Sequence, residues 1–262
     1  MARIVFSDID GTLLTDDKRV TEKTEQAVKG LVQQGIPFVL VSARMPEAIY
    51  PITEAMGVKI PLISYSGALV LTEEGETLYS LTMKAEHAAV EMHFPQATVN
   101  YYAGHHWYVK DTSDPRVALE MKITGAVAER RSFADCLTEG TLPHKILLMM
   151  EPADCEWAER ELQALFPALN VVRSAPHLLE IMDASVNKAS GIEVMLKHFG
   201  LEASDALSFG DNYNDLEMLR YTGASVAMGN APQPVKAAAG EVTTSNEEDG
   251  IYVYLSEHHL IG

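Results

Sequence analysis

An acidic turn near the start of the chain constrains the fold more than any other stretch. A short, largely apolar run ends there in two carboxylates and a turn, Ile4-Val5-Phe6-Ser7-Asp8-Ile9-Asp10-Gly11-Thr12. Such a run is typical of a buried strand, and open α/β sheets bind ligands at the carboxyl ends of their strands. Two neighbouring carboxylates repel each other. We therefore expect Asp8 and Asp10 either to share a cation or to be ordinary residues of a polar turn.

The charge of the chain excludes some classes of partner. The 262 residues carry a formal net charge of -17, which argues against nucleic acid or an anionic membrane surface, because both bind through basic patches. A small anionic substrate needs only local positive charge and is still allowed. Cys136 and Cys155 lie far apart, so we expect two idle thiols. Without a recognisable signal peptide or membrane span, we expect a cytoplasmic protein.

Both ends of the chain predict a parallel sheet covered by helices, because buried strands alternate there with amphipathic segments. Pro51 falls inside one of these helices, where we expect it to produce a kink. The strands are expected over 4–8, 36–41, 61–64, 206–210 and 224–229, and the helices over 21–35, 46–57, 189–199, 215–221, 234–239 and from 250 onward. A hairpin is expected over 69–79.

The middle of the chain follows another pattern. Between about residues 83 and 183 the strands look half-exposed and pair as hairpins, which is typical of an antiparallel α+β domain. The expected elements are strands over 98–102, 106–109, 145–150, 170–173 and 178–182, and a helix over 155–166 with Trp157, Leu162 and Leu165 on its inner side. We therefore predict a core domain of residues 1–82 and 184–262, with residues 83–183 inserted as a second domain.

Polar residues follow several of the predicted parallel strands, and one lysine opens a helix. Since the carboxyl ends of parallel strands share one edge of the sheet, we expect these residues to converge. They are Asp8, Asp10, Ser42, Lys188, Asp211, Asn214 and Asp215. Carboxylate oxygens with few His or Cys ligands nearby favour magnesium over zinc. A magnesium site with a lysine and a hydroxyl is suited to phosphoryl transfer.

The motifs resemble those of the haloacid dehalogenase (HAD) superfamily of phosphohydrolases. Asp8 to Leu14 is similar to its first motif, DxDGTLL, and Gly210 to Asp215 is similar to its fourth, GDxxND. Ser42 and Lys188 match the second and third motifs. The inserted segment resembles the type IIB cap of the Cof-type sugar-phosphate phosphatases. The resemblance implies a Rossmann-like α/β core with an inserted α+β cap, and a small phosphorylated metabolite as substrate.

The resemblance also implies roles for the acidic residues. Asp8 would be the nucleophile and a ligand of Mg²⁺. Asp10 would be the general acid and base, with its backbone carbonyl on the metal. Asp211 would bind the metal, and Asp215 would bind or support it. A role of Asp215 as a simple helix cap stays open at this point.

Further residues would contact the phosphoryl group. The resemblance assigns Ser42, the backbone N–H of Ala43, Lys188 and Asn214 to this role. Ordinary roles compete: Ser42 and Asn214 could be turn residues, and Lys188 a surface lysine. Arg44 could reach the substrate or brace its loop.

Two departures from the family pattern lie near this site. Ser42-Ala43-Arg44 replaces the commoner Thr-Gly-Arg and keeps the hydroxyl. Ser66-Gly67-Ala68 replaces Asn-Gly-Ala, so a contact between residue 66 and the leaving group is in doubt.

Two other functions stay open on the sequence. A phosphomutase of the phosphomannomutase type shares the cap and the Asp-x-Asp motif. A receiver-like phospho-switch also uses carboxylates at strand ends, magnesium and a lysine, but such domains are shorter and lack a cap. The sequence does not predict an oligomeric state.

Overall fold

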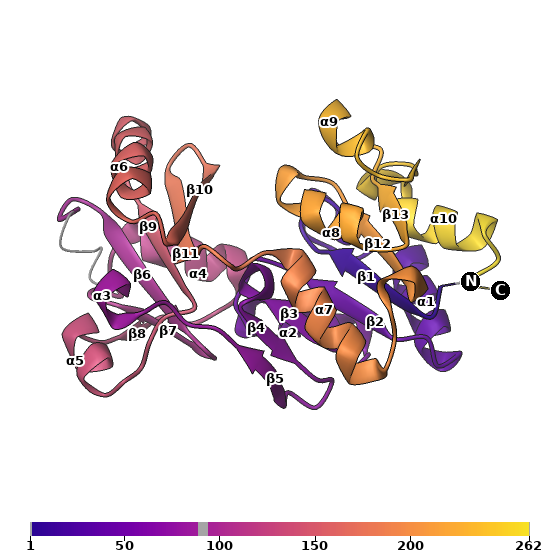
Figure 1. Cartoon of the computed structure of the whole chain (residues 1–262), viewed down its shortest axis with the longest axis horizontal. Coiled ribbons are helices and arrows are strands. Elements are labelled where there is room, and N and C mark those ends of the chain that lie inside the picture. The colour runs from indigo at the N-terminus through magenta and orange to yellow at the C-terminus, as the bar shows by residue number, and fades with distance from the viewer. Residues whose placement is uncertain (1, 89–93, 262) are drawn as a thin grey trace. The chain divides into compact units, whose positions relative to one another are not determined.

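The computed structural model describes residues 2–88 and 94–261. These residues divide into two compact units (Figure 1). The core unit comprises residues 2–44, 49–79 and 187–261, and the inserted unit comprises residues 45–48 and 80–186. The core unit is thus built from both ends of the chain, and the inserted unit mainly from its middle.

An eight-stranded sheet forms the centre of the core unit. Its order is β14-β13-β12-β1-β2-β3-β4-β5, with parallel pairs from β14 to β3 and an antiparallel pair between β3 and β4. The strands are β1 (Ile4–Asp8), β2 (Phe38–Val41), β3 (Leu62–Ser64), β4 (Leu69–Leu71), β5 (Thr77–Ser80), β12 (Ala206–Gly210), β13 (Ala224–Ala227) and β14 (Glu241–Val242). The chain leaves β1 towards β2 and returns on the other side of β1 at β12. The carboxyl ends of β1 and β12 therefore form a switch point, where such sheets bind ligands.

The central strands form because both of their faces are covered by apolar contacts. All five residues of β1 are buried, and their side chains alternate between the two faces. One face packs against α7 (Lys188–Phe199) and α8 (Leu216–Tyr221). The other face carries α1 (Glu22–Gln33) and α10 (Gly250–Glu257), with Tyr254 edge-on to Phe209. This packing fixes the switch point from both sides.

The helices of the core unit begin and end at the signals that the sequence carries. Thr21 accepts a hydrogen bond from the Thr24 amide at the start of α1, and Asn187 accepts one from Ser190 at the start of α7. Gly200 ends α7 in a left-handed conformation with φ 64°. The core unit also contains the short α9 (Gln233–Lys236). Among the described helices, none combines the length and the apolar character needed to cross a bilayer.

The helix expected over 46–57 is divided into two pieces. Pro46–Ala48 forms a 3₁₀ turn, η1, and α2 (Tyr50–Met56) follows it. Pro51 therefore lies in the first turn of α2, where a missing N–H breaks no intrahelical hydrogen bond. The expected kink at Pro51 is wrong, because the helix is interrupted before the proline rather than at it.

The inserted unit is built on a six-stranded sheet in the order β10-β11-β9-β6-β7-β8. Its pairs are antiparallel except for β7 with β8. The strands are β6 (Thr98–Ala103), β7 (His106–Val109), β8 (Glu129–Arg130), β9 (Lys145–Met149), β10 (Leu169–Ala175) and β11 (Leu178–Asp183), and the helices are α3 (Ala85–Ala88), α4 (Pro115–Thr124), α5 (Phe133–Thr138) and α6 (Pro152–Leu165). Both expected hairpins are present.

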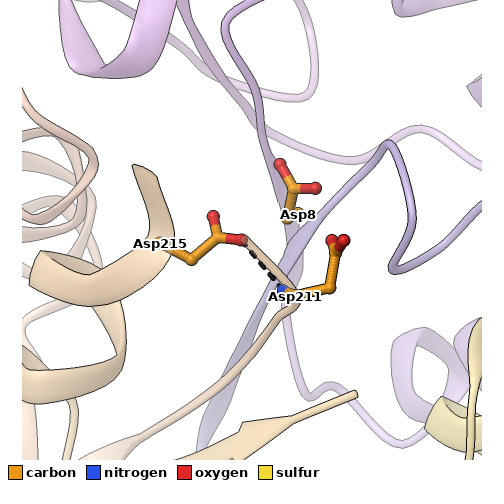
Figure 2. A group of neighbouring side chains, drawn as sticks. All are labelled: Asp8, Asp211 and Asp215. Carbon is orange, nitrogen blue, oxygen red and sulfur yellow. Dashed lines mark hydrogen bonds between the residues drawn. The ribbon is translucent and has the colours of Figure 1, made fainter. Parts of the chain in front are cut away.

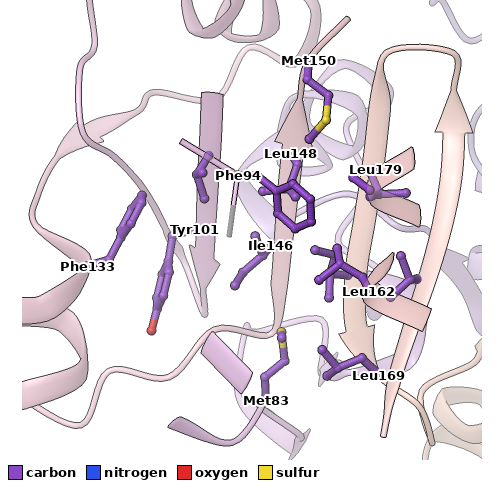
Figure 3. Packing of buried hydrophobic residues seen from close by; sticks show 14 of the residues in the cluster. Met83, Phe94, Tyr101, Phe133, Ile146, Leu148, Met150, Leu162, Leu169 and Leu179 are labelled. Atoms are coloured by element: carbon purple, nitrogen blue, oxygen red, sulfur yellow. The ribbon is translucent and has the colours of Figure 1, made fainter. Parts of the chain in front are cut away.

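The core of the inserted unit lies between this sheet and its helices (Figure 3). Tyr101 stacks on Phe133 of α5, and Leu162 of α6 is fully buried in the same cluster. Cys136 and Cys155 are free thiols buried there, as predicted. The expectation of half-exposed strands is wrong for β9, in which every residue is buried.

The inner face of α6 also differs from the expectation. Cys155, Ala158 and Leu162 are buried, following the helical spacing of three and four residues. Trp157 and Leu165 are exposed, so their predicted inward orientation is wrong. Leu162 was assigned correctly, but the other two lie on a different side of the helix from it.

A buried histidine ties three segments of the inserted unit together. The Gly104 amide donates a hydrogen bond to Nδ1 of His144 (3.0 Å), and Nε2 lies 2.9 Å from Oγ of Ser80. Because Nδ1 accepts a hydrogen bond, it carries no proton. The ring is therefore neutral, with its proton on Nε2. Burial lowers the pKa of His144 from 6.5 to about 4, and the charge of His105 adds to this effect.

This histidine predicts a loss of stability in mild acid. The unfolded chain takes up a proton at His144 near pH 6.5, whereas the folded chain does so only near pH 4. The free energy of unfolding should therefore fall as the pH drops from 6.5 to 4, by on the order of 3 kcal/mol from this residue alone. Urea unfolding at several pH values measures it. In His144→Gln, which keeps an acceptor and a donor but does not titrate, this part of the loss should be absent. An unchanged pH slope would contradict the prediction.

Candidate active site

Three carboxylates meet at the switch point of the core unit (Figure 2). Asp8 is the last residue of β1, Asp211 follows β12, and Asp215 ends the 3₁₀ turn η5 (Tyr213–Asp215) before α8. One oxygen from each lies within 4.8 Å of the others. The sequence predicted this convergence, and it follows from the parallel pairing of β1 with β12.

Asp215 is fully buried and holds its own loop together. One of its oxygens accepts hydrogen bonds from the amides of Asp211 and Asn212, each 2.9 Å long. Its side chain does not cap α8, so the alternative of a simple helix cap is not supported. A Cβ at Gly210 would lie only 2.7 Å from that of Asp215, which explains the glycine at this position.

Lys188 joins two of the carboxylates from the first turn of α7. Its side chain is 0% exposed, and Nζ lies 2.5 Å from Oδ1 of Asp8 and 2.5 Å from Oδ1 of Asp215. The alternative of a surface lysine is therefore excluded. An ammonium group buried between two carboxylates is paired on both sides, as a buried charge must be.

Burial also raises the pKa values of two carboxyl groups in this cluster. It raises the pKa of Asp8 to about 8, and although Lys188 opposes this, the charges of Asp215 and Asp211 reinforce it. Burial likewise raises the pKa of Asp211 to about 6. Burial would lower the pKa of Lys188, but the two carboxylates outweigh it and raise that pKa. Lys188 alone thus does not offset the negative charge of the cluster. Hard oxygen donors in this arrangement fit Mg²⁺.

Asp10 lies beside this cluster but forms a separate set of contacts. Arg44 donates to both of its carboxylate oxygens, with Nε 2.7 Å from Oδ2 and Nη2 2.7 Å from Oδ1. Lys18 donates to Oδ1 at 2.8 Å. Burial would raise the pKa of Asp10, but the hydrogen bonds and charges of Arg44 and then Lys18 outweigh it and hold the pKa below its usual range. Two roles were left open for Arg44, a contact with the substrate and the bracing of its loop. These hydrogen bonds support the bracing role.

The carboxylate of Asp10 is not one of the three that meet at the acidic cluster. The metal role expected of its backbone carbonyl stays a prediction.

The loop after β1 is held by residues to which the sequence analysis gave no role. Thr12 donates through Oγ1 to Asp211 (2.7 Å), and Asn230 donates through Nδ2 to the carbonyl of Gly11 (2.8 Å). Gly11 has φ +84°, and a Cβ there would lie 2.4 Å from Oδ2 of Asp211. Asn230 follows β13, whose carboxyl end lies at the same sheet edge. That position was the signal that could have identified it.

The residues that were predicted to contact phosphate differ in burial and in hydrogen bonding. Ser42 is buried after β2, and its Oγ accepts the Arg44 amide (3.2 Å). Ala43 follows it and is partly buried. The Asn214 side chain is exposed in η5 and makes no hydrogen bond to any other described residue. The structure therefore groups Lys188 with the acidic cluster but leaves Asn214 outside it.

A strained turn connects the Ser42 loop to the start of α7. The turn is η2 (Tyr65–Gly67), in which Tyr65 and Ser66 have φ values of 49° and 55°. The Ser66 amide donates to the carbonyl of Ser42 (2.9 Å). A Cβ on Gly67 would lie 2.2 Å from the carbonyl oxygen of Asn187, so only glycine allows this approach.

The same close approach is completed from α7 by a second glycine. A Cβ on Gly191 would lie 2.5 Å from Ile63 and 3.0 Å from the Cα of Gly67. Backbone contact between η2 and α7 thus sets the position of Lys188.

Comparison with protein families gives one match over nearly the whole chain. The family of haloacid dehalogenase-like hydrolases matches residues 5–255. The chain belongs to this family. The resemblance and the fold inferred from the motifs are therefore confirmed.

Curated relatives of this HAD-like hydrolase are named as phosphatases. A Haemophilus influenzae protein named "Putative phosphatase" is 36% identical over 98% of each chain. The 5-amino-6-(5-phospho-D-ribitylamino)uracil phosphatase YitU of Bacillus subtilis is 27% identical over 97% of each chain. These relatives support the prediction that the chain is an enzyme of the HAD-like phosphatase class.

Solved structures share the whole fold. A haloacid dehalogenase-like hydrolase from Bacteroides thetaiotaomicron superposes with a TM-score of 0.90 at 29% identity, over 98% of this chain and 100% of that one. The HAD subclass IIB sugar phosphatase BT4131 superposes with a TM-score of 0.84 at 24% identity, over 99% and 100%. The second likeness concerns the fold alone.

The buried lysine leads to a prediction about stability. Lys188→Met leaves the carboxylates of Asp8 and Asp215 without their common partner. In EDTA at neutral pH, the free energy of unfolding should therefore fall by about 3–5 kcal/mol. Urea denaturation measures it. Lys197→Met, on an exposed position of the same helix, should change it by less than about 0.5 kcal/mol. Equal effects of the two substitutions would refute the role of Lys188 as a buried counter-charge.

Proposed function

We propose that this HAD-like hydrolase is a magnesium-dependent phosphatase that acts on small phosphorylated metabolites, among them sugar phosphates, through an aspartyl-phosphate intermediate. The observation that supports this most strongly is the Lys188 ammonium, buried between Asp8 and Asp215. It supplies a fixed positive charge beside Asp8, the strand-end carboxylate that we assign as the nucleophile. The second carboxylate needed for proton transfer, Asp10, lies two residues further along the same loop.

Asp8, Asp211 and Asp215 are the residues that would hold or support Mg²⁺, with the backbone carbonyl of Asp10. Both oxygens of Asp215 already accept hydrogen bonds, one set from Lys188 and one from the loop amides. We therefore assign Asp215 mainly to the orientation of Asp211, which then presents its carboxylate to the metal. Bound there, Mg²⁺ would offset negative charge on the phosphoryl oxygens.

The protein residues divide the reaction into two proton-coupled steps. An oxygen of Asp8 attacks phosphorus, forming the aspartyl-phosphate as the bond to the ester oxygen breaks. Asp10 gives a proton to that leaving oxygen and then accepts one from the water that hydrolyses the intermediate. Lys188 favours the ionised form of Asp8 and holds the carboxylate in place by its hydrogen bond to Oδ1. Ser42, the amide of Ala43 and Asn214 are assigned to the remaining phosphoryl oxygens.

The inserted segment is assigned to substrate selection. We propose that residues 83–183 form a cap that excludes water and chooses the leaving group. The names of two relatives support small phosphorylated metabolites: the YitU protein above, and the HMP-PP phosphatase of Serratia proteamaculans, which is 27% identical over 90% of this chain and 87% of that protein. The two buried free thiols are consistent with a reducing compartment, and we propose the cytoplasm.

Replacement of the nucleophile tests the mechanism directly. Asp8→Asn should lower the hydrolysis of para-nitrophenyl phosphate by roughly 10³-fold or more, because an amide cannot form the acyl phosphate. Phosphate release is measured, and circular dichroism checks the fold. Asp17→Asn, at an exposed position of the same loop region, should keep full activity. Activity of Asp8→Asn near that of the wild type would rule out the assignment. Phosphate that moves to another position of a sugar rather than into water would favour the phosphomutase.

Removal of the metal is a second test. EDTA should abolish phosphate release, and excess Mg²⁺ should restore it, because the acidic cluster is otherwise short of positive charge. Isothermal titration of Mg²⁺ into the wild type and Asp211→Asn gives a readout that does not depend on turnover. We expect binding to the wild type and at least about tenfold weaker binding to the variant. Activity that persists in EDTA would remove magnesium from the mechanism.

A further inference from the structure

An asparagine in the loop after β13 connects three segments beside the acidic cluster. Asn230 donates through Nδ2 to the carbonyl of Gly11 (2.8 Å), and the same nitrogen lies 3.5 Å from Oδ2 of Asp211. Oδ1 of Asn230 accepts a hydrogen bond from the backbone amide of Asn246 (3.1 Å). Because both ends of the side-chain amide are engaged, its orientation is fixed.

The backbone that carries Asn230 is also fixed on both sides. The Met228 amide donates to the carbonyl of Gly210 (3.0 Å), and the Gly229 amide donates to the carbonyl of Thr244 (2.9 Å). A Cβ on Gly229 would lie only 2.8 Å from the carbonyl carbon of Thr244, so this approach requires glycine. The loop therefore presents Asn230 from a position that other segments determine.

The backbone held by Asn230 lies directly against the Asp211 carboxylate. A Cβ on Gly11 would lie 2.4 Å from Oδ2 of Asp211, and Thr12 donates through Oγ1 to Oδ1 at 2.7 Å. A shift of the Gly11 and Thr12 backbone would therefore turn or displace this carboxylate. The hydrogen bond from Asn230 to the Gly11 carbonyl restrains that shift.

Asn246 takes a different part in the same network. It is only 6% exposed, and its Nδ2 donates to the carbonyl of Leu14 (2.9 Å), so its side chain satisfies a buried carbonyl of the loop after β1. Asn230 is exposed, and water can replace its hydrogen bond to Gly11. The contact of Asn246 with Asn230 is made by the backbone amide, which a substitution of the Asn246 side chain leaves in place.

We propose that Asn230 is a positioning residue for Asp211 as a ligand of Mg²⁺, an inference that rests on the proposed function. Asn230 acts through the backbone of Gly11 and Thr12, which holds the Asp211 carboxylate in one orientation. A carboxylate that is oriented before the metal arrives loses less freedom when the metal binds. Loss of the Asn230 side chain should therefore weaken Mg²⁺ binding more than it destabilises the fold. Loss of the Asn246 side chain should have the opposite balance.

Isothermal titration of Mg²⁺ into three variants tests this proposal. In Asn230→Ala the dissociation constant should rise about five- to tenfold, whereas in Asn246→Ala it should rise by less than about twofold. Gln233→Ala removes another exposed amide group, at the start of α9, and should bind Mg²⁺ as the wild type does.

Thermal unfolding in EDTA should give the reverse order. The Tm of Asn246→Ala should fall by about 4 °C or more, because a buried carbonyl loses its donor, and that of Asn230→Ala by less than about 2 °C.

The dependence of turnover on Mg²⁺ separates positioning from a general loss of structure. Phosphate release from para-nitrophenyl phosphate is measured over a range of Mg²⁺ concentrations. In Asn230→Ala the concentration for half-maximal activity should rise by the same factor as the dissociation constant, while kcat at saturating Mg²⁺ stays within about threefold of the wild type.

The outcomes that overturn the proposal differ from those that overturn the proposed function. Unchanged Mg²⁺ affinity in Asn230→Ala, or a Tm loss as large as that of Asn246→Ala, would refute the positioning role while the wild type still binds Mg²⁺ and releases phosphate. Equal losses of affinity in the two variants would refute it as well. A wild type that binds no Mg²⁺ would refute the proposed magnesium dependence and the positioning role together.

Discussion

The contact between one buried ammonium and two buried carboxylates organises the candidate active site of this protein. Lys188 comes from the first turn of α7, Asp8 from the end of β1 and Asp215 from the turn before α8, so a single side chain joins three segments that are far apart in sequence. An ammonium group with no exposed surface is stable only with such partners. The same contact leaves the cluster with an excess of negative charge, which is the condition for binding a divalent cation.

The sheet topology supplies the positions, and the loops supply the orientation. Parallel pairing of β1 with β2 and β12 brings the strand ends of Asp8, Ser42 and Asp211 to one edge. The loop contacts then direct the side chains: Thr12 towards Asp211, and Arg44 towards Asp10. Asp8 and Asp10 consequently separate into two environments only two residues apart. Asp8 lies among carboxylates with Lys188 as its counter-charge, whereas Asp10 is held by the two cations Arg44 and Lys18.

The sequence predicted the parts of this site that depend on strand ends. Asp8, Asp211, Asp215 and Lys188 meet as expected, because continuous apolar runs fix the strands and the motifs follow them directly. The contacts of Lys18 and Asn230 could not be predicted in the same way. Each contact depends on how far a flexible side chain reaches across a loop, and no periodic pattern in the sequence marks either residue.

The errors in the elements have related causes. The sequence predicted a kink at Pro51 inside one continuous helix, because periodicity does not show where a 3₁₀ turn separates two helical pieces. Trp157 and Leu165 were assigned to the inside of α6 by their hydrophobicity, although the buried face follows Cys155, Ala158 and Leu162. For Trp157 and Leu165, hydrophobicity suggested burial, but the positions of these residues around the helix place them outside its buried face. The role of Asn214 in phosphate binding stays a prediction.

The paired glycines under Lys188 have a consequence for how such an enzyme can change. Gly67 and Gly191 bring η2 and α7 so close together that a Cβ on Gly67 would meet the carbonyl of Asn187 and a Cβ on Gly191 would meet Ile63. A larger residue at either glycine would therefore push η2 and α7 apart and move Lys188 away from Asp8 and Asp215. The spacing of the three charged groups thus depends on two positions that carry no side chain.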